Sequence, residues 1–148
     1  MVNWDESEAL ALLLGYDLPT EIEWEIAARG KEGREHATSN DQIYDDSEKK
    51  LGHFDVTGLF PSTVDVGSYS PIQIGGVNVF DLLGNVWEWT RSLYRVGESD
   101  RVARGAAYNT DPDPVELRAA RRFEQMPYDH STFFGFRLRC GARTLAAA

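Results

Sequence analysis

The chain has 148 residues, of which 42% are hydrophobic and 26% charged, and its formal net charge at pH 7 is −9. This length suits one domain, and the apolar content is too high for a disordered chain. The excess of acid argues against nucleic-acid and membrane-surface partners, which attract Lys and Arg. The sequence contains no apolar run of the roughly 20 residues that a membrane span needs. One cysteine, Cys140, excludes an internal disulfide and is typical of a cytoplasmic protein, unless a secretion signal has been removed.

Two stretches near the N-terminus predict helices. Asn3 with Glu6, and Thr20 with Glu23, have the spacing of a capping box, in which each side chain bonds the backbone N–H of the other residue. We expect helices over about residues 4–14 and 20–29. The apolar spacing predicts that the following residues face inward: Ala9, Leu10, Leu13 and Leu14 in the first helix, and Ile22, Trp24, Ile26, Ala27 and Ala28 in the second.

The rest of the chain predicts loops and short strands. Residues 31–75 contain many turn-forming residues and read as a long irregular region. Short apolar runs predict strands near residues 64–66, 77–82, 86–90, 102–104, 117–123 and 133–140. The fold class that follows is α+β, with two helices, short antiparallel strands and much irregular loop.

The stretch 77–90 is the most informative part of the sequence. A Gly-Asn turn precedes Trp87 and Trp89, and Glu88 lies between these two indoles. Two such rings are costly to leave in water, and a carboxylate buried with them needs a donor or a cation. Two interpretations stay open for Glu88. It binds Ca²⁺ together with backbone oxygens, or it accepts hydrogen bonds from backbone amides or an arginine.

Four stretches together resemble one family. Residues 81–89 are similar to the "GNVWEW" signature of the formylglycine-generating-enzyme-like family, also called the sulfatase-modifying-factor domain. Residues 18–30, 101–105 and 135–137 match its other motifs in the same order. The resemblance covers about residues 2–140 and lacks the family's N-terminal strands. It implies a C-type-lectin-like fold over residues 1–143 and a tail over 144–148. Without those strands, either the core folds alone or a second chain, as a partner, completes the fold.

The resemblance also implies what the domain binds and whether it is a catalyst. In calcium-binding relatives, the ligands would correspond to backbone oxygens of Leu83, Gly84 and Val86 and the side chain of Glu88. Catalytic relatives hold copper with two cysteines from the stretch that corresponds to residues 106–118. This stretch has no cysteine here, and Arg118 stands where the second one belongs. We therefore expect no copper, no catalytic residues and no enzyme activity. The alternative is a formylglycine-generating oxidase, or an oxidase-like subunit, that acts on a protein cysteine.

The stretch between residues 108 and 133 has a composition typical of recognition surfaces, with rigid aromatic rings beside adaptable polar groups. The alternative is an ordinary loop surface. In one branch of the family, the variable proteins of diversity-generating retroelements, the corresponding stretch is the binding surface. We therefore predict a non-catalytic domain that binds a protein or small-molecule ligand. The predicted ligand-binding residues are Tyr108, Asn109, Asp111, Asp113, Glu116, Phe123, Glu124, Gln125, Tyr128, Asp129, His130, Ser131, Thr132 and Phe133.

Overall fold

A computed structural model describes residues 1–38, 41–44, 50–54 and 62–140. These residues contain two helices, α1 (Trp4–Leu13) and α2 (Glu21–Arg29), and six strands. None of the helices in the described part is long and apolar enough to cross a membrane. The predicted tail, residues 144–148, and parts of the long middle region lie outside the described residues.

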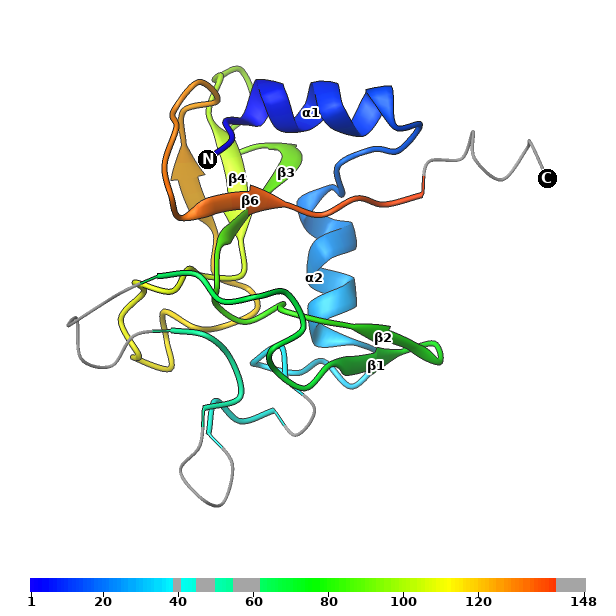
Figure 1. The fold of residues 1–148 in the computed structure, drawn as a ribbon, viewed down its shortest axis with the longest axis vertical. Helices are drawn as coiled ribbons and strands as arrows, with labels where there is room; N and C mark the ends of the chain where they lie inside the picture. The colour runs from blue at the N-terminus through cyan, green and yellow to red at the C-terminus, as the bar shows by residue number, and fades with distance from the viewer. Residues whose placement is uncertain (39–40, 45–49, 55–61, 141–148) are drawn as a thin grey trace.

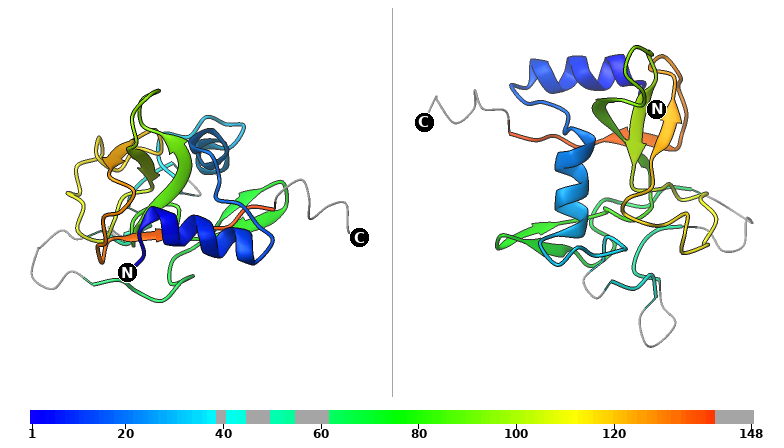
Figure 2. Two further views of the ribbon diagram at one scale, coloured as in Figure 1. Left: turned by 90° about the horizontal axis from the view of Figure 1, so that it is seen from above. Right: turned by 180° about the vertical axis from the view of Figure 1, so that it is seen from behind.

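A four-stranded sheet forms the centre of the molecule, in the order β5-β4-β3-β6 (Figure 1). Its strands are β3 (Trp87–Leu93), β4 (Arg101–Arg104), β5 (Phe123–Gln125) and β6 (Phe134–Phe136). The pairs β3–β4 and β4–β5 are antiparallel, as expected, but β3 and β6 are parallel. A separate hairpin of β1 (Ile72–Ile74) and β2 (Val77–Val79) lies beside the C-terminal end of α2 (Figures 1 and 2). The α+β class is confirmed, and the parallel pair corrects the prediction of antiparallel strands alone.

Both predicted capping boxes are present. The Asn3 side chain accepts from the backbone N–H of Glu6 at 2.8 Å, and the Glu6 carboxylate accepts from the N–H of Asn3 at 3.0 Å. Thr20 and Glu23 bond reciprocally in the same way, at 3.2 and 2.7 Å. These bonds satisfy backbone donors that the first turn of a helix leaves without partners, so both helices begin where the sequence predicts.

The predicted buried face of α1 is wrong, and that of α2 is right only for Trp24 and Ala28, which are buried as expected. Six residues that the sequence predicts to face inward are exposed: Ala9, Leu10, Leu13, Leu14, Ile22 and Ile26. In α1 the buried residues are Trp4, Ser7 and Ala11, and in α2 they are Trp24 and Ala28. The large Trp24 indole lies on the inward face of α2, where its N–H donates to the buried Glu88 carboxylate. Ile22 and Ile26 therefore face outward. Residues two positions from Trp24 lie on the opposite side of a helix.

Two predicted strands are absent from the described residues. Residues 64–66 form no ladder, because the backbone N–H of Val64 bonds the side chain of Asn85 at 3.1 Å. Residues 117–122 form turns, and the N–H of Ala119 donates to Glu35 O at 2.8 Å, so β5 begins only at Phe123. The strand predicted over residues 133–140 is limited to β6. Side chains and distant loops take the backbone bonds that a strand would have used.

The core lies where the helices meet β3. Trp89 is fully buried and stacks on Phe134 with ring centroids 4.5 Å apart. Its indole N–H donates to Val2 O at 3.3 Å, and the indole of Trp4 donates to Thr90 O at 2.7 Å. Figure 2 shows α1 lying along one end of the sheet. The beginning of the chain is thereby fixed to its central strand.

Candidate functional site

Glu88 lies at the centre of a buried polar cluster. Its carboxylate accepts from the indole N–H of Trp24 at 2.7 Å and from Arg137 Nε and Nη2, both at 2.5 Å. Arg137 Nη2 also donates to Phe80 O at 3.1 Å and to Asp81 O at 3.4 Å. Burial would lower the pKa of Arg137, but the adjacent Glu88 carboxylate outweighs it and raises that pKa above its ordinary value. The cluster joins α2, β3 and the segment after β6 through one charge pair.

The predicted calcium ligands lie along one turn, and the oxygens of Leu83, Gly84 and Glu88 already accept hydrogen bonds. Leu83 O accepts from His53 N at 3.2 Å, and Gly84 O accepts from Val86 N at 3.0 Å. Both carboxylate oxygens of Glu88 bond the Arg137 guanidinium. In this arrangement the Glu88 side chain does not fit a cation, because the guanidinium already supplies the positive charge. Its contacts match the arginine-paired interpretation, and calcium binding at this turn stays a prediction.

The Gly-Asn turn shows why glycine is needed beside this cluster. Gly84 has φ +81°, and a Cβ on it would lie 2.1 Å from His53 O. Its N–H donates to Gly105 O at 2.7 Å, and the next N–H, of Asn85, donates to His53 O at 2.7 Å. A side chain at residue 84 has no room. The turn therefore fixes where β3 begins and how Trp87 enters the sheet.

A pocket of 260 Å³ is lined mainly by residues of the predicted recognition stretch, residues 108–133. Its wall comes from the start of β3, the loop after β4, the start of β5 and the residue before β6. The lining residues are Trp87, Asn109, Thr110, Asp111, Glu116, Arg121, Phe123 and Phe133. Five of these, residues 109, 111, 116, 123 and 133, belong to the predicted set. Trp87, Thr110 and Arg121 do not.

Aromatic rings form one side of this pocket. Trp87 stacks on Phe123 with ring centroids 4.8 Å apart, and Phe133 meets Tyr108 edge-on at 6.4 Å. Trp87 is 6% exposed, yet its indole N–H has no partner among the described residues. An indole with most of its surface buried normally donates a hydrogen bond, as those of the other three tryptophans do. The pocket is therefore lined in part by apolar rings, and the Trp87 nitrogen keeps access to solvent.

Polar groups form the other side. Arg121 Nε and Nη2 both contact Glu116 Oε2, at 3.0 and 2.9 Å. Asp111 Oδ1 accepts from the N–H of Asp113 at 3.0 Å, which shapes the turn that carries the rim. Thr110 Oγ1 accepts from the N–H of Ala107 at 2.9 Å. These groups can hydrogen-bond a ligand and hold its orientation.

The other predicted ligand-binding residues do not line the pocket. Tyr108 is buried behind it, and its hydroxyl lies 3.0 Å from Thr132 Oγ1. His130 Nε2 lies 3.1 Å from Glu6 Oε2, so it holds its loop against α1. The remainder serve local structure or are exposed at a distance from the pocket lining: Asp113, Glu124, Gln125, Tyr128, Asp129 and Ser131. The predicted set thus divides into a pocket and a surrounding loop surface.

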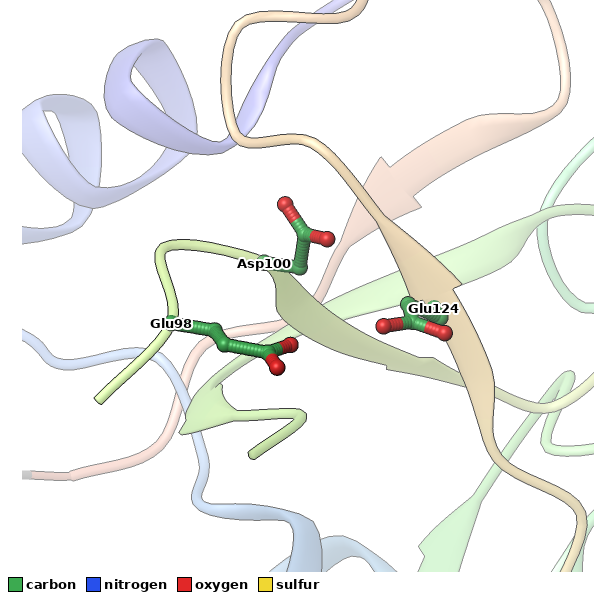
Figure 3. A group of neighbouring side chains, drawn as sticks. All are labelled: Glu98, Asp100 and Glu124. Carbon is green, nitrogen blue, oxygen red and sulfur yellow. The ribbon is translucent and has the colours of Figure 1, made fainter. Parts of the chain in front are cut away.

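A separate group of carboxylates lies at the far end of β4 and β5. Glu98, Asp100 and Glu124 are neighbours in space, with one oxygen of each within 4.8 Å of the others (Figure 3). Arg95 Nη1 already contacts Glu98 at 3.3 Å and Glu124 at 3.2 Å. This guanidinium offsets one of the three negative charges, and exposed acidic groups commonly lie together without an ion. We therefore assign no metal to the group.

The arrangement of helices, sheet and long loops defines a C-type-lectin-like domain with a pocket on its loop surface. The sequence model of one protein family, the sulfatase-modifying factor enzyme 1-like domain, matches residues 1–141. The chain therefore belongs to the formylglycine-generating-enzyme-like family.

Two curated relatives show the range of this family. The chain is 34% identical over 150 residues to the inactive C-alpha-formylglycine-generating enzyme 2 of Bos taurus, covering 95% of this chain and 49% of that protein. It is 27% identical over 170 residues to the formylglycine-generating enzyme of Mus musculus, covering 99% of this chain and 44% of that one. The chain therefore spans about half the length of these relatives.

Two solved structures are similar to the whole fold. PvdO from Pseudomonas aeruginosa superposes with a TM-score of 0.73 at 22% identity, over 93% of this chain and 59% of that chain. Variable protein 1 of Treponema denticola superposes with a TM-score of 0.63 at 26% identity, over 83% of this chain and 46% of that one. The first likeness concerns the fold alone, and both agree with the C-type-lectin-like class.

Proposed function

We propose that this domain is a non-catalytic recognition module that binds a protein or small-molecule ligand in the pocket between Trp87 and Phe133. The observation that carries the proposal is the Trp87 indole, which is almost buried in the pocket wall but donates to no described residue. A ligand acceptor placed there would gain a hydrogen bond in a largely apolar setting. A ligand pocket usually combines an apolar wall with a few convergent polar groups.

The cysteine content supports a role without oxidase chemistry. Cu(I) prefers thiolate ligands, and a two-thiolate site needs two cysteines. The chain has only Cys140, which is exposed and does not line the pocket. The similarity to a relative that is named inactive agrees with this proposal. The alternative is an oxidase that acts on a protein cysteine, which the similarity to a formylglycine-generating enzyme favours.

A more specific version of the proposal is a variable receptor of a diversity-generating retroelement. Its support is the likeness to the variable protein of Treponema denticola. The genomic surroundings provide a direct test. A template repeat that matches the codons of residues 108–133, beside a reverse-transcriptase gene, would support this version, and the absence of any such repeat from the complete genome would contradict it.

Ligand binding can be tested without knowing the natural ligand. We would titrate a fragment library of amines, acids, sugars and aromatic compounds into ¹⁵N-labelled protein and follow the Trp87 indole signal by NMR. Fragments are expected to shift this signal, and Phe133→Ala should weaken their binding. Tyr128→Ala is the matched aromatic control, since Tyr128 is 61% exposed and does not line the pocket. A library that leaves the Trp87 signal unchanged would contradict the proposal.

The oxidase alternative needs its own assay. We would incubate the protein with Cu(I), O₂ and a cysteine-containing peptide, and measure oxygen uptake and aldehyde formation in the peptide. Turnover above the copper-only control would overturn the non-catalytic proposal. A second copy of this chain as the partner is tested by analytical ultracentrifugation of the purified protein: a dimer would support it, and a monomer would contradict it.

A further inference from the structure

The charges that line the pocket do not cancel. Among its lining residues, Asp111 and Glu116 are acidic and Arg121 is basic. Both Arg121 contacts go to the same Glu116 oxygen, at 3.0 and 2.9 Å, so these two charges offset each other. Asp111 is exposed and has no ion pair with any described residue. One carboxylate at the rim is therefore available to a cation from solvent.

The aromatic wall favours the same sign of charge. The ring faces of Trp and Phe carry partial negative charge and attract ammonium and guanidinium groups. Trp87, Phe123 and Phe133 line the same pocket as Asp111. They also offer apolar surface on which a hydrocarbon stem can lie. An anionic ligand would meet Asp111 and these ring faces unfavourably, whereas a cation gains from both.

Resting on the proposed function, we propose that the pocket selects a guanidinium or ammonium group on an apolar stem. Arg and Lys side chains of a protein partner have this chemistry, as do free alkyl amines. The cation lies against Asp111, the stem packs on the rings of Phe123 and Phe133, and an acceptor on the ligand takes the Trp87 indole N–H.

The test compares ligands that differ only in charge. The probes are Nα-acetyl-arginine methylamide and its neutral isostere, Nα-acetyl-citrulline methylamide, titrated while the Trp87 indole signal is followed by NMR. The arginine compound should bind about fivefold more tightly, which is the scale of one solvent-exposed charge pair with a cation–π contact. n-Butylguanidine, with one guanidinium like the arginine compound, is the free-cation probe. Tighter binding of the capped amino acid than of n-butylguanidine indicates a protein side chain, and equal binding indicates that the free cation suffices.

A matched pair of variants locates the charge. Asp111 and Asp113 each accept one backbone hydrogen bond within the same turn, through Oδ1, but only Asp111 lines the pocket. Asp111→Asn keeps that acceptor and should abolish the preference for arginine over citrulline. Asp113→Asn should leave the preference unchanged.

Three outcomes would overturn the inference. Equal binding of the arginine and citrulline compounds would show that the pocket binds ligands without selecting their charge. An unchanged preference in Asp111→Asn would show that another group selects the cation. No shift with either compound, when library fragments do shift the Trp87 signal, would show that the ligand class is wrong while the binding function stands.

Discussion

The Glu88–Arg137 pair makes the sharpest test of the fold. Arg137 supplies two of the three hydrogen bonds that Glu88 receives, and the Glu88 side chain is only 7% exposed. Arg137→Met keeps most of the side-chain volume but leaves the carboxylate buried with Trp24 as its one remaining donor. Removing one partner of a buried pair costs about 3–5 kcal/mol, compared with about 0–1 kcal/mol for an exposed pair. We expect the larger cost in the free energy of unfolding.

The assay is urea unfolding at pH 7 followed by tryptophan fluorescence, for the wild type, Arg137→Met, Glu88→Gln and the double variant. Because the two residues contact each other, the double variant should lose about 2 kcal/mol less than the sum of the single losses. The reasoning fails if Arg137→Met costs under about 1 kcal/mol, as exposed pairs do, or if the two losses add.

The same proteins test the calcium prediction. If Ca²⁺ binds at this turn, millimolar Ca²⁺ should raise the Tm of the wild type relative to EDTA, and Glu88→Gln should remove the effect. An identical Tm in Ca²⁺ and EDTA would contradict a calcium site there.

Three further predictions concern the turn before β3 and helix α2. Gly84→Ala should prevent folding or cost over about 3 kcal/mol of unfolding free energy, because its Cβ would lie 2.1 Å from a backbone oxygen. Gly75→Ala is the control, since a Cβ there meets no atom within 4 Å. It should cost only about 1 kcal/mol, because alanine is strained at a φ of +57°. Soluble yield and urea unfolding compare them, and equal losses would contradict the steric argument. Ile22→Lys should change the free energy of unfolding by less than about 0.5 kcal/mol, because Ile22 is 67% exposed; a loss near that of a core substitution would show that this face is covered.

The third concerns Glu25. Burial would raise the pKa of Glu25, but hydrogen bonds from Arg104 and Arg29 outweigh it and hold the pKa below its ordinary value of 4.5. A carboxyl whose pKa is lower in the folded than in the unfolded protein stabilises the fold at neutral pH. This contribution is lost as the pH falls through the folded-state pKa. The difference in unfolding free energy between wild type and Glu25→Gln should therefore shrink from about pH 5 to about pH 3. A difference that stays constant would argue against the assignment.

The local signals of the sequence are the ones that the structure confirms. The two capping boxes are set by residues three positions apart, so they need no knowledge of the fold. The inward faces of the helices were predicted from hydrophobicity alone, which placed Ile22 and Ile26 inward together with Trp24, although only Trp24 is buried. The choice depends on a partner 64 residues away, because the Trp24 indole bonds Glu88. Tertiary contacts of this kind override helical periodicity.

The candidate site shows the same limit. Seven of the eight residues that line the pocket lie within the stretch 108–133, and five of these seven were predicted to bind a ligand. Trp87 was missed because it was assigned to the core together with Glu88, and the sequence holds no sign that one of the two indoles keeps its N–H free. Arg121 was taken as part of a strand. The arginine that pairs with Glu88 could be foreseen as a type of partner but not as Arg137, which lies 49 residues further along the chain.

The position of β3 has a consequence for how the protein assembles. Its neighbours include β6, more than forty residues later, and its residues Trp89 and Thr90 contact Val2 and Trp4, more than eighty residues earlier. Closing such long loops costs chain entropy before any contact repays it, and topologies of this kind fold on the millisecond-to-second scale. During synthesis the sheet cannot be completed until residue 136 has left the ribosome. Until then, the apolar surface of β3 is open to chaperones and to aggregation.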